Sequence, residues 1–143
     1  EEQSLGGLDY LLATQRRAET MVQRSQARLE SLREEEQQAM KEEARALEEE
    51  EAARDALASR VLDSGDGEDL QEAFYLATDA VARVSGALAA RTAQRRAAEE
   101  ALERAREELR RAGEDTRTMA DKRKRKEQSA EGRRKGREVQ GKA

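Results

Sequence analysis

The chain has 143 residues, of which 42% are charged, 36% apolar and 2% aromatic, and its formal net charge is −4. With one Phe, two Tyr and no Trp or Pro, the composition argues against a compact globular core and is typical of long helices. The absence of His and Cys excludes imidazole chemistry, thiol nucleophiles and soft-metal sites, so we expect no enzyme, no catalytic residue, no metal and no cofactor.

Residues 1–62 are predicted to form the first coiled-coil helix. Taking Leu8 as position a of a heptad gives a mostly apolar stripe that is sustained to the end of the segment. The a positions are Leu8, Gln15, Val22, Leu29, Glu36, Glu43, Glu50 and Leu57, and the d positions are Leu11, Ala18, Ser25, Leu32, Ala39, Ala46, Ala53 and Arg60. The charge of this segment is acidic overall.

Residues 63–69 are predicted to form an acidic Asp/Gly turn. Gly65 and Gly67 allow positive φ, and Asp69 with Glu72 matches the spacing of a capping box at the start of the next helix. We do not interpret the turn as a calcium loop, because glycines stand where side-chain oxygens would be needed.

Residues 70–126 are predicted to form the second coiled-coil helix, and its heptad stripe starts with Phe74 at position a. The a positions are Phe74, Val81, Leu88, Arg95, Leu102, Leu109 and Thr116, and the d positions are Leu70, Ala77, Val84, Arg91, Ala98, Ala105, Ala112 and Met119. The repeat continues for seven heptads or more, so each helix should be roughly 80 Å long.

Two such stripes joined by a short turn predict an all-α fold, in which two long helices form an antiparallel coiled-coil hairpin within a single domain. If the turn is centred on Gly67, large seam residues face small ones, Glu43 faces Arg91, and Glu36 lies near Arg95. A parallel dimer would instead stack like charges, which favours a monomer. We expect this polar middle to be the weakest part of the hairpin.

Residues 127–143 are predicted to be a basic, glycine-containing, frayed tail. The simplest explanation of the basic run that precedes it is a solvated helix end, which cations near a helix C-terminus favour. The run is also a candidate contact for an acidic protein or an anionic membrane surface. We do not expect nucleic-acid binding, because the tail has no aromatic residue to stack on a base. The candidate residues in this run are Lys122, Arg123, Lys124, Arg125 and Lys126.

A second candidate contact is the apolar group Phe74, Tyr75 and Leu76. Phe74 belongs to the seam, whereas Tyr75 and Leu76 fall at the solvent-facing b and c positions of the heptad. Exposed apolar neighbours can mark a partner contact, but they can also cover the adjacent turn.

The layout resembles the FliJ/YscO family of bacterial type III export systems, which are small stalk proteins of the flagellum and the injectisome. The resemblance lies in the acidic first helix, the Asp/Gly turn, the Ala/Arg/Glu-rich segment 96–111 and the basic end. It implies a non-catalytic, cytoplasmic protein that contacts a hexameric export ATPase and the export gate and escorts chaperones, with no small-molecule substrate. Phe74, Leu76 and Val81 lie in the part of the second helix that can carry a patch for the export gate in such proteins. Contact with the gate would bring the chain to the inner face of the membrane.

A different class of function is a structural coiled-coil spacer or scaffold segment that mediates protein–protein interaction. No apolar run approaches the roughly 20 residues that a membrane helix needs. Because the sequence begins with Glu1 rather than Met, we expect it to be a portion of a longer chain.

Overall fold

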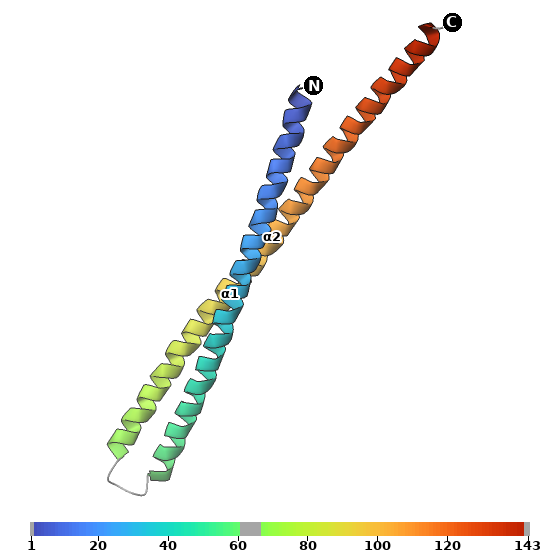
Figure 1. The fold of residues 1–143 in the computed structure, drawn as a ribbon. Helices are drawn as coiled ribbons and strands as arrows, with labels where there is room; N and C mark the ends of the chain where they lie inside the picture. Colours follow the sequence, from blue (N-terminus) through green and yellow to red (C-terminus); the bar gives the residue numbers. More distant parts are fainter. Residues whose placement is uncertain (1, 61–66, 142–143) are drawn as a thin grey trace. The chain divides into compact units, whose positions relative to one another are not determined.

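The structure, a computed structural model, describes residues 2–60 and 67–141. Helix α1 spans Glu2–Arg60, and helix α2 spans Gly67–Gly141 (Figure 1). The two helices pack against each other in opposite directions, so the predicted all-α helical hairpin is confirmed. Within the described residues the backbone has no cis peptide bond and no positive φ angle.

The segment boundaries differ from the predicted ones. Helix α1 ends at Arg60, and residues 61–66, which include most of the predicted turn, lie outside the described part of the chain. Helix α2 begins at Gly67, so Asp69 lies in its first turn beside Glu68 and does not cap it. Acidic residues in this first turn still stabilise the helix, because they face the positive end of its dipole.

Residues 127–141, which the sequence predicts to be a frayed tail, continue α2 as a helix. Residues 122–131 contain neither Gly nor Pro, and the Arg123 guanidinium lies 3.6 Å from the Glu127 carboxylate one turn later. Gly132 and Gly136 each cost about 1 kcal/mol of helix stability relative to Ala, but only Pro would force the helix to end.

The chain divides into two compact units, each of which contains a segment of both helices. Unit 1 consists of residues 1–25 with 102–143, and unit 2 consists of residues 26–101. In an antiparallel hairpin the residues that pack together are far apart in sequence, so this division runs across both helices instead of separating one from the other.

In unit 2 the seam between α1 and α2 is occupied by the predicted heptad positions. The buried residues of this unit are Leu29, Leu32, Ala39, Ala46 and Ala98. Towards Arg60 and Gly67, which we call the connector end, seam residues such as Leu57, Phe74 and Val81 are only half-buried. Burial is therefore deepest around the polar middle, the part for which the sequence predicted the weakest packing.

Unit 1 is also built by pairing the two helices through heptad positions. Leu102, Ala105 and Ala112 are buried, and Val22 and Leu109 are half-buried. A Cβ atom placed on Gly7 would lie 3.8 Å from Met119 Cε, and one on Gly113 would lie 3.9 Å from Gln15 Nε2. Both distances are ordinary van der Waals contacts, so the two helices would also pack with Ala at either position.

The register of the hairpin differs from the predicted one. Arg91 Nη1 lies 3.1 Å from Glu35 Oε2, whereas the sequence placed Arg91 opposite Glu43. The expected proximity of Glu36 to Arg95 is confirmed, with Arg95 Nε 2.8 Å from Glu36 Oε1. The helix ends at residues 60 and 67 place the centre of the hairpin before Gly67, and this shift accounts for the difference.

This pattern of burial predicts the order of amide hydrogen exchange in unit 2. We expect residues 50–60 and 70–90 to exchange at least about tenfold faster than residues 29–46, because shallow packing lowers the free energy of local opening. Hydrogen-exchange mass spectrometry of the full chain measures this order. Faster exchange around Glu36 than at the connector end would contradict the prediction.

Candidate protein-contact surfaces

The three residues of the predicted apolar group, Phe74, Tyr75 and Leu76, do not lie on the same face of α2. Phe74 is half-buried in the seam, and the Arg54 guanidinium of α1 lies 5.8 Å from the centre of its ring. Tyr75 and Leu76 are 57% and 62% exposed. The Tyr75 ring lies 6.2 Å from the Phe74 ring, and Gln71 Nε2 donates a 3.0 Å hydrogen bond to its hydroxyl oxygen. Phe74 therefore anchors the hairpin, and the other two residues are available to a partner.

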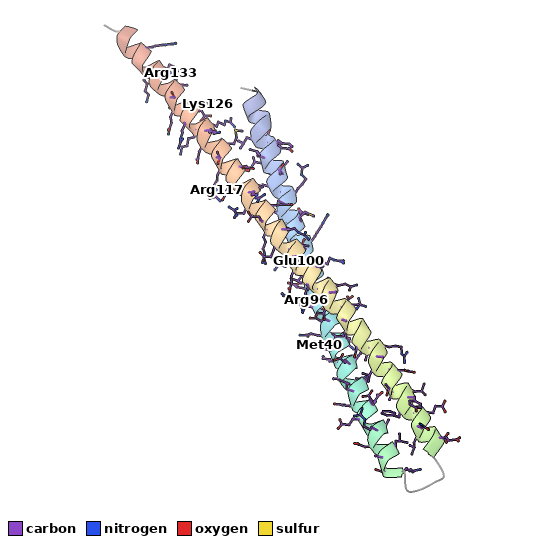
Figure 2. The ribbon with its side chains drawn as sticks, turned by 180° about the vertical axis from the view of Figure 1, so that it is seen from behind. Met40, Arg96, Glu100, Arg117, Lys126 and Arg133 are labelled. Carbon is purple, nitrogen blue, oxygen red and sulfur yellow. The ribbon has the colours of Figure 1, made fainter. Side chains whose placement is uncertain are left out.

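The predicted basic group lies within a longer helical segment, residues 122–137 of α2, which we call the basic arm. Figure 2 labels Lys126 and Arg133 on this segment and Arg117 before it. Every residue of the arm is exposed except Arg123, which is half-buried. Because consecutive helical residues are about 100° apart, Lys122, Arg123, Lys124, Arg125 and Lys126 spread around the helix. The basic side chains of the arm are therefore distributed around the helix, with the acidic Glu127 and Glu131 between the two basic runs.

A network of charged residues crosses the seam of unit 2. Arg95 Nε donates hydrogen bonds of 2.8 and 2.9 Å to the two carboxylate oxygens of Glu36, and its Nη1 donates a 2.9 Å bond to Glu99 Oε1. The same oxygen of Glu99 lies 3.6 Å from Arg33 Nη2 of α1. The Glu36 and Arg95 side chains are only 15% and 23% exposed, so this pair is the best-shielded interhelical ion pair in the described part of the chain.

These contacts shift the pKa values of both groups. The hydrogen bond from Arg95 lowers the pKa of the Glu36 carboxyl below its ordinary value of 4.5, and the same bond raises the pKa of the Arg95 guanidinium. On the surface of unit 1, the hydrogen bond from Arg110 likewise lowers the pKa of Glu107. Both carboxylates therefore stay ionised to a lower pH than they would in an unfolded chain.

The lowered pKa of Glu36 makes its contribution to stability depend on pH. The stabilisation is complete above the unfolded pKa and is lost as the pH falls through the lower folded pKa. We expect Glu36→Gln to lower the melting temperature at neutral pH, and we expect the difference from the parent chain to shrink steadily below about pH 5.

Circular dichroism melting curves between neutral and acidic pH measure this difference. Glu34→Gln is the control, because Glu34 is exposed and has no hydrogen bond or ion pair in the described residues. A Glu36→Gln deficit that stays constant with pH would contradict the assignment.

An open groove of about 380 Å³ lies between the helices of unit 1. Its lining is Thr14, Arg17, Ala18, Met21, Glu108, Arg111, Ala112 and Asp115. Ala18, Met21 and Ala112 give the groove apolar surface, and charged residues of both signs line the rest of it. This chemistry suits a partner side chain better than a catalytic step.

Comparisons of the chain with known protein families, curated proteins and solved structures give no match. In residues 2–60 and 67–141 there is no cluster of metal-ligating side chains. Neither described helix contains a segment long and apolar enough to cross a membrane. The chemistry of the chain must therefore be inferred from its own surfaces.

Sequence reasoning found the apolar and basic groups but missed part of the polar network. Glu99 and Arg33 flank the seam without occupying a or d positions, so the heptad pattern did not single them out. The available signal was the four-residue spacing of Arg95 and Glu99, which is typical of a helical ion pair.

Proposed function

We propose that the chain is a non-catalytic helical stalk of a bacterial type III export system, flagellar or injectisome, that contacts the export ATPase and the export gate. The resemblance of the sequence to the FliJ/YscO family suggests this role. The observation that carries it is the basic arm, which continues α2 and whose basic side chains are distributed around the helix and exposed except for Arg123. Such an arm suits an acidic lumen of a protein ring, because charge on all faces tolerates any rotational setting.

The test measures ATP hydrolysis by purified flagellar and injectisome export ATPases with increasing amounts of the full chain. We expect turnover to rise several-fold at about one chain per hexamer, and the gain to disappear when Lys122, Lys124 and Lys126 are changed to Glu. The matched control is Arg24→Glu with Arg28→Glu, two exposed positions on α1. Failure of the chain to bind either ATPase would reject the proposal.

The second candidate is a structural spacer or scaffold segment. It is favoured by the exposed Tyr75 and Leu76, because such residues at a hairpin end suit association with another coiled coil. A spacer would leave ATPase turnover unchanged, so the same assay separates the two functions. Under either function the protein is non-enzymatic, and the stalk function places it in the cytoplasm.

A further inference from the structure

The connector-end part of α2 differs in composition from the rest of the chain. Charged residues make up 42% of the protein, yet residues 73–90 contain only Asp79 and Arg83. The corresponding part of α1 is strongly acidic and faces water with Glu48, Glu49 and Glu51. A long surface helix with so few charges is unusual unless a second face of it is covered.

The uncovered face lies opposite the seam with α1. Its residues follow the alternating three- and four-residue spacing of a second coiled-coil stripe, and all of them are exposed. They are Leu76, Asp79, Arg83, Gly86 and Ala90. Exposed alanines at positions 82, 87 and 89 flank the stripe. We call this set of residues the outer stripe.

The outer stripe is complementary to itself when two copies run antiparallel. With the twofold axis beside residue 81, Leu76 faces Gly86 of the partner subunit and Asp79 faces the partner's Arg83, and each contact occurs twice. Gly86 has nothing within 4 Å of a Cβ built on it, so it leaves room for a large side chain. Among the described residues neither Asp79 nor Arg83 has a hydrogen bond or an ion pair.

The charges also select the orientation and the partner. A parallel arrangement would place Asp79 on its own copy and Arg83 on its own copy, and the repulsion would oppose it. The antiparallel arrangement pairs opposite charges and sets a large residue against the smallest one. We propose that the outer stripe is a homodimer interface in which two hairpins join through antiparallel α2 helices. The expectation of a monomer concerned parallel pairing through the seam, whereas this interface uses the opposite face of α2. The inference goes beyond the proposed function and does not depend on it.

The charge pair supplies the first test, with the dissociation constant of the full chain measured by sedimentation velocity. We expect a dimer that Arg83→Asp or Asp79→Arg weakens by at least about tenfold, because each places like charges opposite each other. The combined swap Asp79→Arg with Arg83→Asp should restore the affinity to within a few-fold. A monomeric parent chain would overturn the inference, as would a swap that fails to rescue.

Gly86 supplies the second test. We expect Gly86→Leu to weaken the dimer by at least about tenfold while leaving the hairpin folded, because the added side chain meets open space in the single chain. Gly132→Leu is the matched control, since its Cβ also meets open space but lies outside the outer stripe. If the dissociation constant of the dimer is unchanged by Gly86→Leu, the interface lies elsewhere and the inference is rejected.

Disulfide trapping tests the orientation, because the chain has no cysteine of its own. We expect Leu76→Cys combined with Gly86→Cys to form a covalent dimer under mild oxidation, whereas either substitution alone should not. Within one helix these positions are about 15 Å apart, too far for an intramolecular disulfide. Cross-linking by the single Leu76→Cys variant would indicate a parallel arrangement and overturn the inference. Dimerisation with no effect on an export ATPase would leave the inference standing while rejecting the stalk function.

Discussion

Truncation of Leu29 to Ala is expected to destabilise the hairpin by about 2–5 kcal/mol, the cost of removing a large buried aliphatic side chain. Leu29 is 4% exposed and occupies a seam position of α1. Alanine has the higher helix propensity, so the loss comes from packing and not from the helix itself. The seam between two helices buries few large side chains. The expected loss is therefore a large share of the free energy of unfolding of a typical small protein.

The matched control for this truncation is Leu47→Ala on the same helix. Leu47 is 45% exposed, so the same chemical change should alter the free energy of unfolding by less than about 0.5 kcal/mol. Urea unfolding followed by circular dichroism measures both variants against the parent chain. Equal effects at the two positions would contradict the assignment of the seam.

The Glu36–Arg95 pair is expected to give opposite results when one partner or both are replaced. Arg95→Ala should lower the melting temperature by several degrees, and by more than Glu36→Ala does, because Arg95 also binds Glu99. Replacing Glu36 and Arg95 together by Leu should raise the melting temperature above that of the parent chain. The reason is that an apolar layer avoids the cost of holding two charges away from water.

Thermal unfolding of the three variants tests this order. Arg106→Ala is the control, because its contact with Glu103 lies on the open surface, with the two side chains 52% and 75% exposed. It should change the melting temperature little. A double-leucine chain that melts below the parent would mean that the ion pair is worth more than an apolar layer at this position.

The faces of the two helices could be predicted from the sequence. Of the seam positions assigned from the heptads, only Arg60 and Arg91 are exposed, and all eight buried residues of the described chain are at a or d positions. The face of a helix follows from its residue period, which is a local property of the backbone. The same reasoning placed Tyr75 and Leu76 in solvent, where the structure also has them.

The register, the extent of α2 and the division into two units were decided only by the tertiary structure. Arg91 pairs with Glu35 because the register depends on where both helices end, and an error of a few residues in the turn moves every facing pair. The sequence did not predict the helix over residues 127–141. Glycine only lowers helix stability, and the helix propensity of the surrounding residues outweighs that cost. A repeat of seven residues fixes which side of a helix packs, but only contacts between the helices fix which residues meet.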